Sequence, residues 1–196
     1  MKRKGGGFYY TLTFQITFEH DDDEVYFAHC YPYTYSDCCK LLNKICINET
    51  KDRIRKTLLC KTIAGNDCEM VIITNFTSRP EDIAVRKAIV MTSRVHPGES
   101  NASLVMHGTL EFLVSDHEAA AYLRNNYVFK IVPMLNPDGV IVGNYRCSLS
   151  SLDLNRQWIA PSSKTCPENY AVKMMMRKTL ESRDILFYCD YHGHSR

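Results

Sequence analysis

The sequence predicts an α/β fold built on a largely parallel or mixed β-sheet, with an antiparallel hairpin before it. From Leu58 onward, short β-branched apolar runs alternate with stretches of helical periodicity, which is typical of α/β domains. Residues 8–31 instead show the apolar–polar alternation of half-buried strands. The chain has 196 residues, of which 45% are hydrophobic and 23% are charged, enough to bury one core.

The N-terminal segment indicates two strands joined by an acidic turn. Aromatic residues and threonines alternate over residues 8–19, Asp21-Asp22-Asp23-Glu24 forms the turn, and residues 25–31 return as the second strand. A lone two-stranded hairpin is only marginally stable in water. We therefore expect this hairpin to belong to a larger sheet or to pack on the rest of the chain.

The later elements follow in order along the chain. A helix is expected from a cap at Ser36 or Asp37 to about Ile47. The other predicted strands cover residues 71–74, 88–92, 127–134 and 185–189, and the other predicted helices cover residues 99–114, 119–125 and 170–182. In open α/β sheets, functional sites form beyond the carboxyl ends of the strands. The polar motifs of this sequence lie at such strand ends.

Composition and charge exclude several classes of protein. The formal net charge is +2, so we expect no nucleic-acid partner. No apolar run approaches the roughly 20 residues that a membrane span needs, and the first thirty residues lack the pattern of a signal peptide. The nine cysteines are odd in number, and Cys38 and Cys39 are adjacent, which favours reduced thiols. We expect a cytoplasmic protein with no membrane partner.

Three residues at two strand ends suggest a metal site. His96 and Glu99 stand three apart across a Pro-Gly turn that leads into a helix, so both side chains can point at one ion. His192 follows the last predicted strand and is the third candidate. A catalytic zinc ion takes three protein ligands, drawn from histidine nitrogen and carboxylate oxygen, and keeps one position open. The spacing alone also fits a surface pair, and the order of further motifs decides between the two.

Two such motifs lie between these candidates. Asn136-Pro137-Asp138-Gly139 follows a predicted strand and by itself indicates a turn. Residues 143–156 have little periodicity and form a predicted loop, and long loops in compact domains are often functional. Arg146 and Arg156 of this loop could bind a carboxylate or an oxyanion, or could form surface ion pairs.

Taken in order, the motifs resemble the cytosolic carboxypeptidase branch of the zinc carboxypeptidase family. The resemblance extends over nearly the whole chain from Tyr9, and the motifs that carry it are Tyr31-Pro32-Tyr33-Thr34-Tyr35, His96-Pro97-Gly98-Glu99-Ser100, Asn136-Pro137-Asp138-Gly139-Val140, Asn144-Tyr145-Arg146-Cys147-Ser148-Leu149, Asp153-Leu154-Asn155-Arg156 and Asp190-Tyr191-His192-Gly193-His194-Ser195-Arg196. The resemblance implies a mixed β-sheet with helices on both faces, preceded by a small antiparallel β-sandwich. Residues 1–34 would then be the C-terminal hairpin of that sandwich, and residues 35–196 the N-terminal part of a catalytic domain.

The resemblance also assigns the metal site. It implies one Zn²⁺ per chain, held by His96, Glu99 and His192. Asp153 would accept the free N–H of the first histidine and so fix its tautomer and orientation.

The resemblance further assigns the substrate groups and the reaction. Arg146 would polarise the scissile carbonyl and hold the oxyanion, and Asn155 with Arg156 would grip the terminal carboxylate of the substrate. The implied reaction removes C-terminal residues from polypeptides or from polyglutamate chains such as those of tubulin. The residue removed would be glutamate, as in known members of this branch. The implied location is the cytosol, with an association with microtubules.

The family's glutamate general base and a tyrosine have no matching position in this chain, because both lie far beyond the third ligand. We therefore expect a truncated form, in which loss of general acid–base help would cost about 10²–10⁴-fold in rate. Two alternatives remain open. One is a catalytically incomplete zinc-binding or tubulin-binding fragment, and the other is an aspartoacylase-type hydrolase of N-acyl amino acids.

Overall fold

The structure is a computed structural model that describes residues 6–8, 10–28, 30–47 and 50–193. Its helices are α1 (Tyr35–Ile45), α2 (Pro80–Val85), α3 (Ser100–Val114), α4 (Glu118–Asn126), α5 (Pro137–Val142), the 3-10 turn η2 (Leu154–Arg156) and α6 (Pro167–Leu180). Its strands are β1 (Ile54–Lys61), β2 (Asp67–Ile73), β3 (Lys87–Ser93), β4 (Tyr127–Val132) and β5 (Ile185–Tyr191). None of the helices in the described ranges is long and apolar enough to cross a bilayer.

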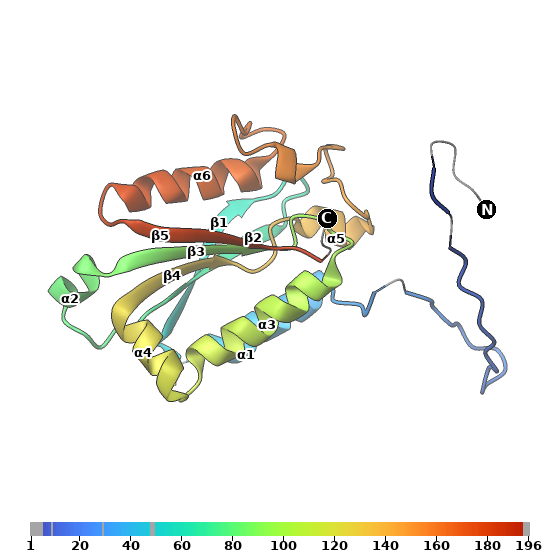
Figure 1. Cartoon of the computed structure of the whole chain (residues 1–196), viewed down its shortest axis with the longest axis horizontal. Coiled ribbons are helices and arrows are strands. Elements are labelled where there is room, and N and C mark those ends of the chain that lie inside the picture. The colour runs from blue at the N-terminus through green and yellow to red at the C-terminus, as the bar shows by residue number, and fades with distance from the viewer. Residues whose placement is uncertain (1–5, 9, 29, 48–49, 194–196) are drawn as a thin grey trace.

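The five strands form one mixed sheet in the order β1-β2-β4-β3-β5. β2 runs antiparallel to both β1 and β4, whereas β3 runs parallel to β4 and β5. The carboxyl ends of β3, β4 and β5 therefore meet at one edge of the sheet, as Figure 1 shows. His96, Asn136 and His192 follow these three ends, so the mixed α/β sheet predicted from the sequence is confirmed.

Helices cover both faces of the sheet, which confirms that expectation as well. Helices α1, α3 and α4 lie on one face and α6 lies on the other (Figure 1). On the first face, Met106 and Leu110 of α3 pack in one buried cluster with Ile89 and Met91 of β3. On the second face, a smaller cluster joins Val172 of α6 to apolar side chains that include those of Cys68, Met70, Val132 and Leu135.

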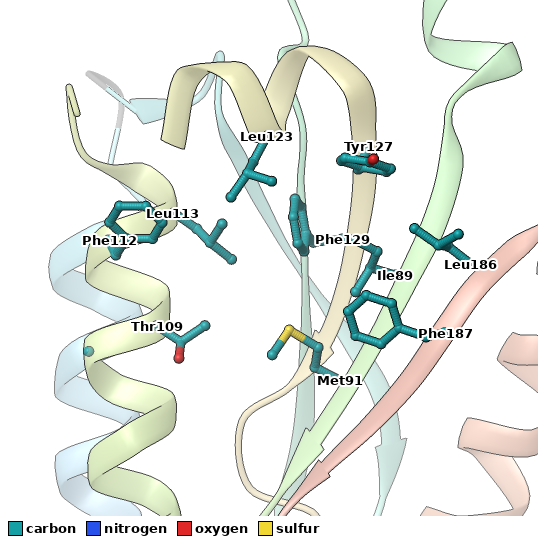
Figure 2. Close-up of a pocket in the computed structure, with 11 residues that line it drawn as sticks. Ile89, Met91, Thr109, Phe112, Leu113, Leu123, Tyr127, Phe129, Leu186 and Phe187 are labelled. Atoms are coloured by element: carbon teal, nitrogen blue, oxygen red, sulfur yellow. The ribbon is translucent and has the colours of Figure 1, made fainter. Parts of the chain in front are cut away.

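The first face is not fully closed at the β5 side. Figure 2 shows an apolar pocket of about 590 Å³ between α3, α4 and strands β3 to β5. Leu186 and Phe187 of β5 line it and remain 47% and 48% exposed. The sheet therefore presents apolar side chains beside its β5 edge.

Helix α1 begins slightly earlier than the sequence analysis expected. Thr34 is the cap, because its side-chain oxygen accepts a hydrogen bond from the Asp37 N–H at 3.1 Å. The Asp37 carboxylate accepts in return from the Thr34 N–H at 2.9 Å. Asp37 thus closes a capping box three residues inside the helix, and the prediction of Ser36 or Asp37 as the cap was wrong.

The described residues before α1 contain no strand, so the two predicted strands are not formed there. The chain does turn back at the acidic run, where Asp22 has a φ of 55°, and the rings of Phe14 and Phe27 lie 5.5 Å apart. Tyr10 and Leu12 are 93% and 85% exposed. A segment that buries so little apolar surface lacks the main stabilisation of a strand pair. The assignment of residues 1–34 to a β-sandwich stays a prediction.

Candidate metal centre

A braced turn connects β3 to α3 and carries the first two predicted ligands. Arg94 has a φ of 59° and is 4% exposed. Its Nε donates to the carbonyl of Pro97 at 2.7 Å and its Nη1 donates to Oγ of Ser103 at 2.9 Å. At Gly98, an added Cβ would lie 2.5 Å from the ring of Tyr145, so only glycine fits. These contacts fix the backbone between His96 and Glu99.

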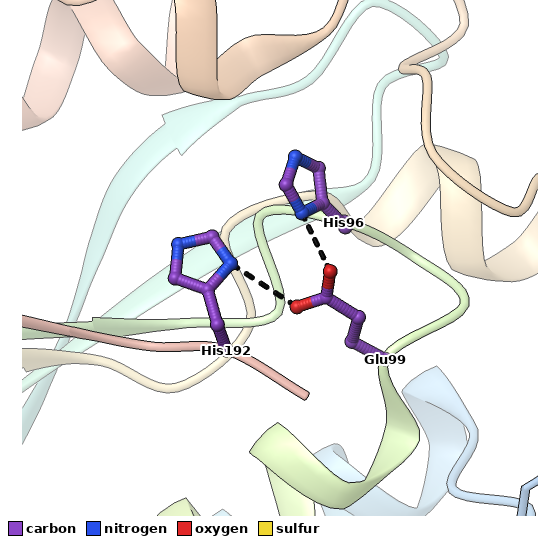
Figure 3. Close-up of side chains that lie close together, drawn as sticks. All are labelled: His96, Glu99 and His192. Carbon is purple, nitrogen blue, oxygen red and sulfur yellow. Dashed lines mark hydrogen bonds and ion pairs between the residues drawn. The ribbon is translucent and has the colours of Figure 1, made fainter. Parts of the chain in front are cut away.

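The structure brings the three predicted ligands together around the Glu99 carboxylate. His96 Nδ1 lies 2.7 Å from Glu99 Oε1, and His192 Nδ1 lies 3.1 Å from Glu99 Oε2 (Figure 3). The three candidate ligand atoms all lie within 4.8 Å of one another. His96 and Glu99 are buried, whereas the His192 side chain is 26% exposed. One ion at this point could bind all three side chains and still face solvent on the His192 side.

The second ring nitrogen of each histidine, the one that does not face Glu99, lies close to another carboxylate. His96 Nε2 lies 3.1 Å from Asp153 Oδ1, which is the partner the sequence analysis assigned. His192 Nε2 lies 3.0 Å from Asp190 Oδ2. A ligating imidazole usually donates its second N–H to such a group, which sets the ring's tautomer and orientation. With the Nδ1 atoms facing Glu99 and the Nε2 atoms facing carboxylates, the donor set fits zinc.

Asp190 as the partner of His192 was missed in the sequence analysis. The signal was available, because alternate residues of a strand share a face and Asp190 stands two before His192. Thr92 of the neighbouring strand β3 also donates to the Asp190 carboxylate, at 2.6 Å. Asp190 is thus held from the sheet on one side and from the histidine on the other.

Electrostatics favour an ionised carboxylate at the centre. Burial by itself would raise the pKa of Glu99, but the Gly193 N–H at 2.8 Å and the neighbouring His96 and His192 hold the pKa below its usual value. The pKa of Asp153 is lowered in the same way, since hydrogen bonds from His96, the Asn155 N–H and Arg146 outweigh its burial. Glu99 is therefore ready to bind a cation without first losing a proton.

Burial has the opposite outcome at Asp190. It raises the pKa of this carboxyl, and the hydrogen bonds from Thr92 and His192 offset the rise only in part. The two carboxylates behind the histidines therefore differ in how readily each carries its charge.

Asp153 links the metal cluster to the predicted substrate loop. Arg146 donates from Nε and Nη2 to Asp153 Oδ2, both at 2.8 Å, and its side chain is 38% exposed. Asp153 also accepts from the Asn155 N–H at 2.9 Å, as the first residue before the η2 turn. Arg146 and His96 thus bond to the same carboxylate, that of Asp153. The Nη1 atom of Arg146 takes no part in the two hydrogen bonds from Arg146 to Asp153.

Asn155 and Arg156 lie on η2, next to this cluster. The Asn155 side-chain oxygen accepts from the Trp158 indole N–H at 3.0 Å. Arg156 is exposed, and its guanidinium bonds only weakly to the Asn155 carbonyl, at 3.4 Å. The structure brings both residues to the rim of the site without drawing them into the histidine cluster.

The Asn136 motif is a short helix start and not a free turn. Asn136 accepts from the Gly139 N–H and donates to the carbonyl of Val95, at 3.1 Å each. Asp138 is buried and accepts hydrogen bonds from the β1–β2 connection, at Thr62 Oγ1 and the Ala64 N–H. The motif therefore ties the end of β4 to the turn before His96. It acts on the site through the backbone.

Fold and site together define a class of protein, one in which a candidate metal-binding His–Glu–His cluster lies at the strand ends of a mixed α/β sheet. Comparison with known proteins identifies the family within that class. The zinc carboxypeptidase family (peptidase M14) matches residues 44–196. The chain belongs to this family.

Individual relatives agree with that assignment. The chain is 47% identical over 188 residues to cytosolic carboxypeptidase 2 of Mus musculus and 49% identical over 199 residues to cytosolic carboxypeptidase 1 of Homo sapiens. These matches take in 95% and 97% of this chain, but 22% and 16% of the relatives. The chain thus spans about a fifth of the length of the curated relatives it matches.

Solved structures show the same fold. A putative carboxypeptidase A from Shewanella denitrificans superposes with a TM-score of 0.73 at 30% sequence identity, over 83% of this chain and 40% of the other. The carboxypeptidase A of Helicoverpa armigera superposes with a TM-score of 0.68 over 83% of this chain and 46% of its own, at 19% identity. The second match supports the fold alone.

Proposed function

We propose that this chain carries the zinc-binding part of a carboxypeptidase that removes C-terminal residues from polypeptides. The observation that carries the proposal is the junction of Glu99, two histidines and the Asp153–Arg146 pair at one sheet edge. His96, Glu99 and His192 would hold one zinc ion. When bound, zinc supplies an activated water and polarises the scissile carbonyl.

The arginine beside this centre suits the charge that develops during hydrolysis. Asp153 fixes the guanidinium of Arg146 through Nε and Nη2. The remaining donor, Nη1, can then bond to the carbonyl oxygen of a substrate as negative charge builds on it. Preorganised donors of this kind account for about 10²–10³-fold in rate.

Asn155 and Arg156 would select for a chain end. Their position on the exposed η2 turn, next to Asp153, puts an amide and a guanidinium within the same rim. A guanidinium binds a carboxylate with two parallel hydrogen bonds. An internal peptide bond offers no carboxylate at that place, so this pair would favour exopeptidase over endopeptidase cleavage.

The three carboxylates around the histidines are already engaged. Glu99 lies between both imidazoles, and Asp153 and Asp190 each accept from one. We therefore infer that the general base comes from outside this group, in keeping with a chain that spans only part of its relatives. The proposed substrates are polypeptide C-termini or polyglutamate chains, tubulin among them. The proposed location is the cytosol, on the strength of the relatives' names.

The test compares peptides that differ only at the C-terminal carboxylate. The zinc-loaded chain is incubated with a peptide ending in two glutamates and with its C-terminal amide, and released glutamate is measured. The proposal expects release from the free acid alone, slowed by about 10²–10⁴-fold where the general base is missing, and none from Glu99→Gln. Zinc binding without release would favour an incomplete zinc-binding fragment. Hydrolysis of N-acetyl-aspartate in place of the peptide would favour an acylase.

A further inference from the structure

A second groove lies on the α6 face of the sheet, lined by none of the metal-site residues. It has a volume of about 740 Å³. Strands β1, β2 and β4 form one wall and helix α6 forms the other, and the residues that line it include Thr57, Leu58, Leu59, Cys60, Met70, Lys130, Tyr170, Met174, Met175 and Lys178.

One wall of this groove is an open strand edge. In the sheet that the described residues form, β1 lies at the end of the strand order and pairs with β2 only. Its outer backbone N–H and C=O groups are therefore available to another extended chain. Leu58 is 50% exposed on this strand. An extended peptide that adds to such an edge gains main-chain hydrogen bonds and can place alternate side chains in an adjacent groove.

The groove also holds positive charge that the described residues leave without a carboxylate. Lys130 is half-buried, and its Nζ donates to Oγ1 of Thr179 at 2.6 Å. Throughout the described ranges, no carboxylate lies within ion-pair distance of Lys130 or Lys178, and none lines the groove. Burial, and then Arg183 and Lys178 nearby, lower the pKa of Lys130. A half-buried cation close to two others favours an anionic ligand.

The opposite wall is apolar and adaptable. Met174 and Met175 of α6 line it, and Tyr170 is 40% exposed beside them. Methionine is unbranched and polarisable, so it packs against apolar side chains of various shapes. The groove therefore offers an apolar wall, cations and a free strand edge together.

We propose that this groove binds an extended polypeptide segment in which acidic and apolar residues alternate. The segment adds to the edge of β1, directs acidic side chains to Lys130 and Lys178, and directs apolar side chains to Leu58 and the methionines. The open edge favours a polypeptide over an acyl chain, which would match the charge and the apolar wall but could not pair with β1. Binding here needs no free C-terminus, so it is independent of the proposed hydrolysis.

The test measures binding of a fluorescein-labelled peptide by fluorescence polarisation. The probe is nine alternating glutamate and valine residues, acetylated and amidated so that it has no terminal carboxylate. Micromolar binding that weakens as NaCl is raised is expected. Lys130→Met should raise the Kd about tenfold, and Lys178→Glu and Leu58→Asp, both at exposed positions, should each raise it by at least about threefold. Lys40→Glu, on α1 across the sheet, is the matched control and should leave the Kd unchanged.

Two further peptides and a fatty acid, sodium oleate, separate the possible occupants. A peptide with lysine in place of glutamate should not bind, and one with proline at alternate positions should bind poorly because proline cannot pair with a strand edge. Far-UV circular dichroism checks that each variant is folded. Equal binding of all three peptides, no binding of the probe, or unchanged binding by Lys178→Glu and Leu58→Asp would overturn the proposal. So would displacement of the probe by sodium oleate combined with full tolerance of proline.

Discussion

The turn that holds two of the proposed zinc ligands and the loop that holds the proposed substrate groups are built in different ways. In the turn, His96 and Glu99 are buried, and the guanidinium of Arg94 fixes the backbone between them. In the loop, Arg156 is exposed, and Asn155 bonds to Trp158 of the same loop. The turn is thus fixed by the fold, whereas the substrate groups lie on a segment open to solvent.

This difference implies that metal binding and substrate binding are separable in this chain. The ligand cluster needs only β3 and β5 of the sheet and helix α3, which packs on that sheet. The loop is attached to α6 by Leu154, which is buried in one cluster with Val172, and by polar contacts such as Asn169 Nδ2 to the Leu154 carbonyl at 2.9 Å. Asp153 joins the two regions directly, through His96 on one side and Arg146 on the other. The Gly98 N–H joins them a second time by donating to the Tyr145 carbonyl at 2.7 Å.

The test with the largest expected effect replaces Glu99, the proposed ligand that contacts both histidines. Glu99→Gln keeps the size of the side chain but loses the charge that faces both histidines. Loss of an outer partner of a metal ligand costs about 10–100-fold in metal affinity, so loss of the ligand itself should cost more than about 100-fold. The measurement is competition with a chromophoric zinc chelator. Glu111→Gln, on α3 where the carboxylate pairs with Lys44 of α1 at 2.8 Å, is the control and should bind zinc as the unsubstituted chain does.

A second test uses the pH dependence of stability to compare Glu168, at the start of α6, with the carboxylates of the metal cluster. Burial raises the pKa of Glu168, in the first turn of α6 beneath the loop, from 4.5 to about 7. The folded chain then holds this proton more tightly than the unfolded chain. The free energy of unfolding should fall as pH rises from about 4.5 to 7, by roughly 3 kcal/mol, and then level off. Glu168→Gln should lack that fall in urea unfolding at pH 5 and pH 8.

The carboxylates of the metal cluster should act in the opposite direction. Because the folded pKa of Glu99 lies below its usual value of 4.5, this group adds stability above that pH and loses it as pH falls through the folded pKa. The same holds for Asp153. A pH-independent difference between Glu168→Gln and the unchanged chain would contradict the assignment of the fall to Glu168.

A third test compares the two carboxylates behind the histidines. Asp153→Asn and Asp190→Asn each remove the negative partner of one imidazole and keep the shape of the side chain. Each should weaken zinc binding by about 10–100-fold. Asp153→Asn should also free Arg146, whereas Asp190→Asn should not, so only the first should alter peptide binding at matched zinc occupancy. Equal effects of both on peptide binding would count against Asp153 as the link between the regions.

The sequence predicted the buried parts of this fold better than its exposed ones. The strand at residues 88–92 was found because β3 is buried on both sides and residues 88–91 are continuously apolar. Strand β1 was missed because it is an edge strand, with the exposed polar residues Arg55 and Lys56 near its start. Helix α6 begins at Pro167, three residues before the predicted start, because proline suits a first helical turn.

Some residues of the candidate site were predicted from the sequence and others were missed. Short-range spacing located His96 and Glu99, since one turn fixes their relation, and the strand end located His192. Asp190 was not recognised as the partner of His192, although strand alternation places the two residues on one face of β5 and its continuation. The N-terminal hairpin was predicted from alternation alone, and alternation cannot supply the neighbouring sheet that such strands need.

The smallest expected effect is the one that decides whether the two regions are separable. Among the described residues, the exposed guanidinium of Arg156 makes one weak hydrogen bond, to Asn155. In Arg156→Ala the zinc Kd should therefore stay within about twofold and the free energy of unfolding within about 0.5 kcal/mol. Binding of a peptide with a free C-terminus should weaken, and binding of its amide should not change, because only the free acid presents a carboxylate to this side chain. Arg156→Lys keeps the charge without the planar pair of donors and should restore only part of the loss. A drop in zinc affinity in Arg156→Ala would show that the loop supports the metal cluster, and the separation drawn between turn and loop would then fail.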